Sequence, residues 1–116
     1  MTPDGDLARV LDEMADAVIV VDAAMSIHYA NRAAAQLLGV DDFSGRTLTD
    51  FVPERYRSQH AAGFRRYTET RSGVLVGGHP VRVPAMRADG TEADVQLTLA
   101  ATTGSDGELL IVGSLR

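Results

Sequence analysis

The sequence predicts a single α+β domain, and two patterns carry the prediction. The first half of the chain alternates short strand-like and helix-like segments and ends in a longer amphipathic stretch at 54–70. The second half changes to a hydrophobic period of two residues, which is typical of strands with one buried face. A chain of 116 residues suits one hydrophobic core, so we expect residues 1–116 to form one domain.

Composition and charge exclude several classes of protein. The chain is 45% hydrophobic and 23% charged, which is typical of a globular protein. A net charge of −5 argues against nucleic-acid binding, since proteins that bind phosphate backbones are usually basic. The absence of cysteine excludes disulfides, thiolate metal sites and thiol nucleophiles. Short apolar runs and the acidic start "MTPDGDLARV" predict neither membrane insertion nor a signal peptide, and therefore a cytoplasmic domain.

The N-terminal third is predicted to hold a short helix followed by two strands. Asp4 or Asp6 can cap a helix within residues 1–15, because a carboxylate there accepts from unpaired backbone amides. Its apolar stripe consists of Leu7, Val10, Leu11 and Met14. The segment "AVIVVDAAMSIHYAN" then predicts two strands around a turn at 22–25. Its first strand is apolar on both faces and should be internal in the sheet.

Two further helices are predicted before the pattern changes. Asn31 is placed to cap the helix "RAAAQLLG", and Gly39 is placed to end it. One or two single turns should follow, carrying inward the side chains of Leu48, Phe51 and Val52. Pro53 lies near the start of the longer helix at 54–70.

Three strands joined by two turns are predicted between residues 79 and 115. The turns are "ADGT" at 88–91 and "GSDGE" at 104–108, because Asp-Gly tolerates the positive φ that tight turns require. The middle strand alternates cleanly, with one face formed by Ala93, Val95, Leu97 and Leu99. Pro80 and Pro84 cannot donate to a β-ladder, so the first of the three strands should be at an edge.

This order of elements resembles the PAS sensor fold. The similar segments are "DEMADAVIVVDAAMSIHYANRAAAQLLGV", "GRTLTDFVPERYRSQH" and "RADGTEADVQLTLA". The resemblance implies a five-stranded antiparallel sheet with helices packed on one face, formed by residues 16–116 after the helix in residues 1–15. It also implies a sensory domain of a larger bacterial signalling protein, for example a two-component system, that works as a homodimer with a covalently linked effector domain.

A cavity beneath the long helix is the ligand site that the PAS resemblance implies. In "RYRSQHAAGFRRY" helical spacing places four side chains on one face with Gly63 beside them, while Arg57, Arg65 and Arg66 point elsewhere. The predicted ligand-binding residues are His60, Phe64, Gly63, Tyr67, Tyr56, Leu48, Phe51, Val83, Leu97 and Ile111. A lining of small aliphatic residues favours a small hydrophobic or amphiphilic ligand, with His60 and Tyr67 as polar anchors.

Two alternatives stay open. "YRSQHAAGFRRY" is also similar to a helix of the haem-binding PAS domains of bacterial oxygen-sensing histidine kinases, where the histidine matching His60 is the axial ligand. That resemblance implies a haem-b gas or redox sensor, although Gly63 replaces an aromatic residue and Arg82 is expected to point outward. The second alternative is a ligand-free module for dimerisation or interaction.

Nothing in the sequence predicts an enzyme, because the nucleophile, phosphate-loop and metalloprotease motifs are absent. His28 is expected on the exposed face of its strand with no role, and His79 is expected on the surface. The three histidines lack metal-site spacing, and we expect no carboxylate cluster beside any of them. No metal site is therefore predicted, apart from His60 if haem is bound.

Overall fold

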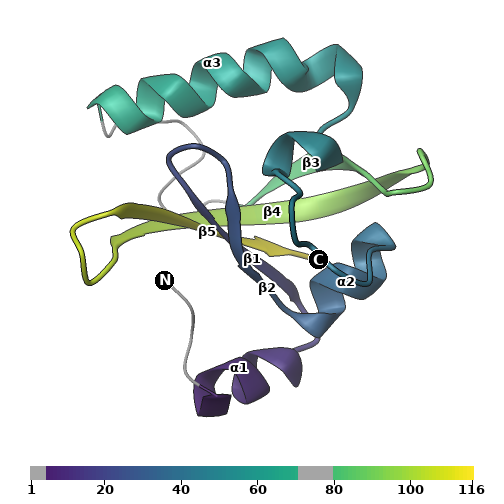
Figure 1. Ribbon diagram of the computed structural model, residues 1–116. Coiled ribbons are helices and arrows are strands. Elements are labelled where there is room, and N and C mark those ends of the chain that lie inside the picture. The colour runs from purple at the N-terminus through teal and green to yellow at the C-terminus, as the bar shows by residue number, and fades with distance from the viewer. Residues whose placement is uncertain (1–4, 71–79) are drawn as a thin grey trace.

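The computed structural model describes residues 5–70 and 80–116. Within these residues five strands form one antiparallel sheet with the order β2-β1-β5-β4-β3 (Figure 1). The strands are β1 (Ala17–Asp22), β2 (Ile27–Ala30), β3 (Val81–Met86), β4 (Glu92–Thr103) and β5 (Leu109–Leu115). The helices are α1 (Gly5–Asp12), α2 (Arg32–Leu38), the 3₁₀ turn η1 (Leu48–Phe51) and α3 (Glu54–Thr70). The predicted α+β class and five-stranded antiparallel sheet are confirmed.

The sheet joins the two halves of the chain at the β1–β5 pair, where Val20 lies opposite Val112. Strand β1 is internal and almost wholly buried, as its double-sided apolar pattern predicted. Strand β3 lies at one edge, as its prolines predicted. The inner face of the sheet meets α2 and η1 in a core of mainly aliphatic side chains, such as Ala34 and Leu38, together with the aromatic Phe51.

The turns follow the sequence signals closely. Gly90 and Gly107 have φ of 88° and 84°, so the two Asp-Gly pairs form the predicted turns. Between β1 and β2, the Oδ1 atom of Asp22 accepts hydrogen bonds from the backbone N–H groups of Ala24 and Ser26. The carboxylate therefore fixes the turn and leaves its second oxygen, Oδ2, for another partner.

Asn31 is the most fully engaged polar side chain of the core, with 1% of its surface exposed. Its Oδ1 atom caps α2 by accepting from the N–H of Ala34 at 3.0 Å, as predicted, and also accepts from the N–H of Val18 at 2.9 Å. Its Nδ2 group donates to the carbonyls of Leu11 and Asp16 at 2.9 and 3.0 Å. One side chain thus joins α2, β1 and the segment that follows α1.

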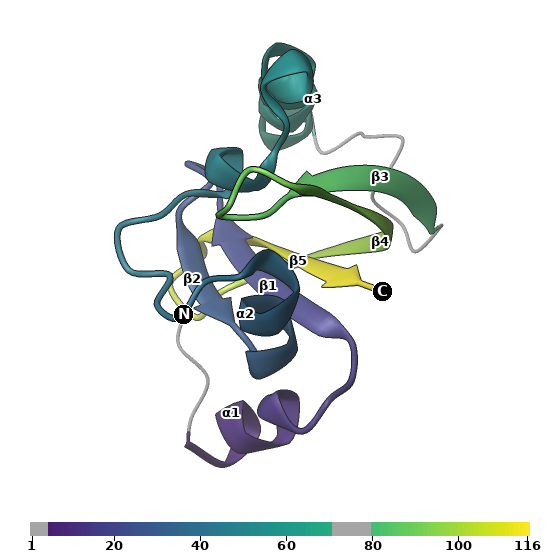
Figure 2. The same cartoon turned by 90° about the vertical axis from the view of Figure 1, so that its right-hand side faces the viewer.

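Helix α1 lies at the opposite end of the molecule from α3 (Figures 1 and 2). The predicted apolar stripe of α1 is not a core face, because Val10 is 61% exposed and Met14, just beyond the helix, is 41% exposed. Leu11 is half-buried, and Leu7 lies outside the residues whose side chains are described. The reason for the difference is position: α1 contacts α2 rather than lying across the sheet.

Replacing Asn31 with alanine should lower the free energy of unfolding by about 3 kcal/mol, because four hydrogen bonds to the backbone are lost and two of them are fully buried. Urea denaturation monitored by circular dichroism measures this loss. The matched control is Gln59→Ala on the exposed face of α3, which should change stability by less than about 0.5 kcal/mol. Equal effects of the two substitutions would contradict the central role of Asn31.

Candidate functional site

Helix α3 turns one face toward the sheet, yet none of its side chains is fully buried. The half-buried side chains recur at helical spacing and are Arg57, His60, Ala61, Phe64, Tyr67 and Thr68. Of these, Phe64 and Tyr67 pack against the core cluster. The inner face of α3 is therefore only partly covered by protein.

Two of the predicted site residues lie away from this face. Tyr56 is 42% exposed, and Gly63 is exposed with open space around its Cα. Tyr56 lies in the first turn of α3, where the Arg55 guanidinium stacks on its ring at 4.7 Å from the centroid. Conversely Arg57, predicted to point elsewhere, is half-buried, because its Nε donates to the carbonyl of Val52 at 2.9 Å. Arg65 and Arg66 are exposed as predicted.

The remaining predicted residues lie on the inner face or within the core. Phe51 and Ile111 are buried in the core cluster, and Leu48 and Val83 pack against it while staying half-buried. Leu97 is also half-buried, on the face where Gly113 leaves room for the side chains of β4. We define the α3–sheet surface as the half-buried, inward-facing side chains of His60, Phe64, Tyr67, Val83 and Leu97.

His60 is the polar group of this surface. Its ring lies 6.0 Å from the Phe64 ring, with 32° between the two planes. Within residues 5–70 and 80–116 its nitrogens have no hydrogen-bond partner. Burial lowers the pKa of His60 below its ordinary value, because the charged form loses water without gaining a counter-charge. The side chain is thus a neutral imidazole with a nitrogen available to a guest.

The residues fit a haem group poorly. A haem-ligating imidazole normally donates its second nitrogen to an acceptor that fixes the ring orientation, and His60 has none among the described residues. Arg82 points outward, as expected, and pairs with Asp94 at 3.1 Å on the exposed face of β3 and β4. His60 could supply the axial nitrogen, but the other polar contacts of such a site are not present in the described part of the chain.

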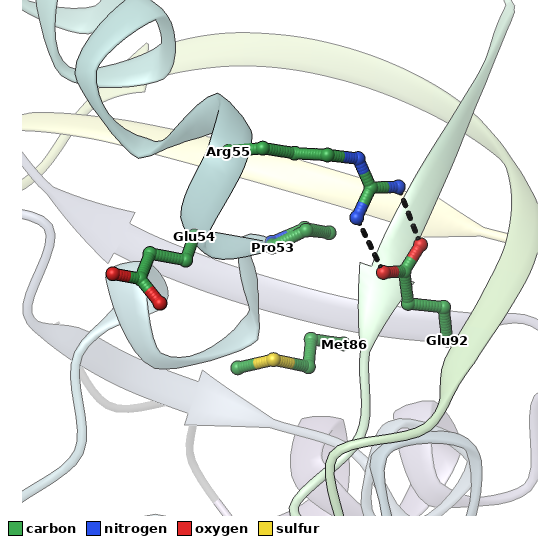
Figure 3. A pocket seen from close by; sticks show the side chains of 5 residues that line it. All are labelled: Pro53, Glu54, Arg55, Met86 and Glu92. Carbon is green, nitrogen blue, oxygen red and sulfur yellow. Dashed lines mark hydrogen bonds and ion pairs between the residues drawn. The ribbon is translucent and has the colours of Figure 1, made fainter.

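A hollow of about 570 Å³ lies at the N-terminal end of α3 rather than beneath His60 (Figure 3). Its lining consists of Pro53, Glu54, Arg55, Met86 and Glu92. Across it, the Arg55 guanidinium donates two hydrogen bonds, of 2.6 and 2.7 Å, to the Glu92 carboxylate. These hydrogen bonds lower the pKa of Glu92. Because both side chains are solvent-exposed, the ion pair is a weak contact between α3 and β4.

A second polar cluster lies at the end of the sheet formed by β1, β2 and β5, and the sequence analysis missed it. His28 is not an exposed side chain without carboxylates: its Nε2 lies 2.8 Å from Asp22 Oδ2 and 3.3 Å from Glu108 Oε1. Burial alone would raise the pKa of Asp22, but hydrogen bonds from His28, Ser26 and Ala24 outweigh it and lower the pKa. His79, the remaining histidine, lies outside the described residues.

The comparison with known families agrees with this architecture. The sequence profile of the diguanylate cyclase-like sensor domains matches residues 10–114. The chain belongs to this family. The matched region contains both polar sites described above, since it runs from within α1 almost to the end of β5.

Individual proteins are similar to this sensor domain in sequence or in structure. A protein of Azorhizobium caulinodans is 36% identical over 93 residues, which are 78% of this chain and 12% of that protein. The PAS domain of an HTR-like protein from Haloarcula marismortui has a TM-score of 0.73 and 20% identity, covering 96% of this chain and 88% of that one. A PAS domain from a two-component sensor histidine kinase has a TM-score of 0.74 and 11% identity, covering 96% and 92%. The sensor domain therefore has a PAS fold.

Within residues 5–70 and 80–116, none of the helices combines the length and the apolar character that crossing a membrane requires.

Acidification should destabilise the sensor domain partly through His60. Below the ordinary pKa of 6.5 the unfolded state binds a proton that folded His60, with its lowered pKa, does not, so stability falls as the pH falls. In His60→Gln the loss of stability from about pH 7 to about pH 5 should be smaller than in the wild type. Urea denaturation across this range measures the difference. A nuclear magnetic resonance titration that places the His60 pKa at or above 6.5 would refute the assignment.

Proposed function

We propose that the sensor domain binds a small hydrophobic or amphiphilic ligand between α3 and the sheet and reports it to an effector domain in the same, larger chain. The observation that carries the proposal is the incomplete burial of the α3–sheet surface. Its apolar side chains point inward and still reach solvent, although the core next to them is closed. The domain itself acts as a sensor and not as an enzyme.

The chemistry of the α3–sheet surface selects the kind of ligand. Phe64, Val83 and Leu97 offer apolar surface, and covering it with a guest is favourable by about 25 cal/mol per Å² removed from water. His60 offers a neutral nitrogen, and the Tyr67 hydroxyl is a second polar anchor on the same face of α3. A guest with an apolar body and one hydrogen-bonding end satisfies both parts of this surface.

Relay of the signal requires that the ligand prefer one arrangement of α3 over another, since equal affinity for two states shifts neither. Helix α3 suits this role because its first turn is held to β4 by the exposed Arg55–Glu92 ion pair and none of its side chains is fully buried. The family, and the histidine kinase that contains one of the similar PAS domains, support a covalently linked effector such as a kinase. We place the whole protein in the cytoplasm as part of a signalling system, for example a two-component system.

Filling the α3–sheet surface should block binding. Leu97→Trp places a large side chain on its half-buried part, so binding of the apolar probe 1-anilinonaphthalene-8-sulfonate should weaken at least about tenfold. The matched control, Gln36→Trp, adds the same side chain on the exposed side of α2 and should leave probe affinity unchanged. Fluorescence titration gives both affinities, and circular dichroism confirms folding. Equal probe binding by wild type and a folded Leu97→Trp variant would contradict this site.

The same protein preparation tests haem as the ligand. Haemin is titrated into wild type and His60→Ala while the visible spectrum is recorded. A sharp stoichiometric spectrum that is lost in the variant would replace the colourless guest with a haem-b sensor that uses His60 as axial ligand. A spectrum independent of His60 would leave the colourless guest, to be identified by mass spectrometry of the organic extract.

We propose in addition that the sensor domain forms a homodimer through α1 and the residues after it. Val10 in α1 and Met14 just beyond the helix are large apolar side chains, and both are exposed. Contact with a second copy would remove these apolar side chains from water and stabilise a dimer, whereas their exposure lowers the solubility of a monomer. This interface would place the proposed ligand site and the dimer contact at opposite ends of one domain (Figure 2).

Charge introduced at this pair should dissociate the dimer. The double substitution Val10→Asp and Met14→Asp should weaken self-association by at least about tenfold, measured by sedimentation velocity over a range of concentrations. Ala62→Asp, on the exposed side of α3, is the matched control and should leave association unchanged. A wild-type domain that stays monomeric at all concentrations would refute the homodimer.

A further inference from the structure

We propose that Asp22, His28 and Glu108 form a binding site for one divalent transition-metal ion, with zinc the best match. The site lies where the turn between β1 and β2 meets the turn between β4 and β5. It is independent of the proposed ligand site under α3, because it shares no residue with the α3–sheet surface.

The fold brings the three ligands together from distant parts of the chain. Asp22 ends β1, His28 lies in the neighbouring β2, and Glu108 directly precedes β5. Antiparallel pairing of β1 with β5 places Asp22 opposite Leu110, and so close to Glu108 on the same face of the sheet. The three candidate ligand atoms, Asp22 Oδ2, His28 Nε2 and Glu108 Oε1, all lie within 4.8 Å of one another.

The distances suit a small ion with tetrahedral coordination. His28 Nε2 is 2.8 Å from Asp22 Oδ2 and 3.3 Å from Glu108 Oε1. Zinc bonds to nitrogen and oxygen are about 2.0–2.1 Å long, so ligand atoms around a tetrahedral zinc are about 3.3 Å apart. The three atoms can therefore take three corners with only small side-chain movements, and the fourth corner stays open to water or to a partner's side chain.

Charge and hydrogen bonding both favour a cation at this cluster. Glu108 Oε1 is buried from solvent and accepts no hydrogen bond from the described residues. Its close polar neighbour is His28 Nε2, but a single ring nitrogen carries at most one hydrogen, and Asp22 Oδ2 lies nearer to it. A buried carboxylate oxygen without a donor is costly. A divalent ion bound here would satisfy that oxygen and balance the two carboxylate charges.

The first-sphere ligands are oriented before any ion binds. The N–H groups of Ala24 and Ser26 hold Asp22 Oδ1 at 2.9 and 3.0 Å, which directs Oδ2 toward His28. The N–H of Glu108 donates to Asp106 Oδ1 at 2.9 Å, which fixes the turn that presents Glu108. Such outer contacts are what a preformed metal site needs. One imidazole and two carboxylates suit zinc, whereas magnesium and calcium prefer sites made of oxygen alone.

Zinc binding would join the β1–β2 turn to the β4–β5 turn. The strands that these turns connect carry part of the core and the inner wall opposite α3. The ion would therefore give the domain a second input that acts on the rigidity of the sheet.

The test uses the chelator-treated domain and zinc chloride. We expect one zinc per chain by isothermal titration calorimetry, and a rise in Tm of about 5 °C or more at free zinc about 100-fold above Kd. Magnesium and calcium chloride should give much smaller shifts. Asp22→Asn, His28→Gln and Glu108→Gln should each weaken zinc binding at least tenfold, as removal of one ligand does. His60→Gln is the matched histidine control and should bind zinc like the wild type.

Glu108→Gln also separates a metal site from a structural ion pair. Without metal, this substitution removes the negative charge of Glu108 beside Asp22 and should not lower Tm. A structural ion pair would instead lose stability in the metal-free variant. A loss of metal-free Tm together with unchanged zinc affinity would overturn the proposal, as would a wild-type domain that binds no zinc or loses its binding in His60→Gln.

Discussion

The structure depends on the hydrogen bonds of one buried amide, that of Asn31. Helix α1, the segment after it, strand β1 and helix α2 each present one backbone group to Asn31, and this single side chain forms hydrogen bonds with all four. Only an amide can accept at one end and donate at the other in this geometry. The position of α2 over the inner face follows from these bonds, and the closed part of the core, around Ala34 and Leu38, follows from α2.

Helix α3 is less well packed than the rest of the described structure. Around β1, β5 and α2 the apolar side chains are buried, whereas α3 is attached by half-buried side chains, one exposed ion pair and the Arg57 contact to the carbonyl of Val52. A ligand-responsive element has to come from the weakly stabilised end of a structure, because it must change arrangement for a few kcal/mol. The division into a closed core and a loosely held helix therefore suits a sensor domain.

The two described histidines illustrate how environment decides chemistry. His60 is half-buried beside the Phe64 ring, so desolvation lowers its pKa. His28 lies between two carboxylates, and these three side chains together form the proposed metal site. Identical side chains are thus suited to opposite tasks, a neutral contact for an apolar guest and a ligand for a metal ion.

The sequence by itself determined whatever is local or periodic. Caps at Asn31 and Gly39, the two Asp-Gly turns, the edge strand and the order of elements could all be predicted, because each depends on neighbouring residues and on backbone geometry. Much of the lining opposite α3 could be predicted too, since alternation fixes which side of a strand faces inward. The prediction that Tyr56 faces inward was wrong, because helical spacing shows which residues share a face of α3 but not which end of that face the rest of the protein covers. Only the tertiary structure decided that Arg57 turns inward and that Glu108 meets Asp22 and His28. The physical reason is that those contacts depend on how β1 pairs with β5 and how α3 begins, and pairing between segments far apart in the chain leaves no local pattern.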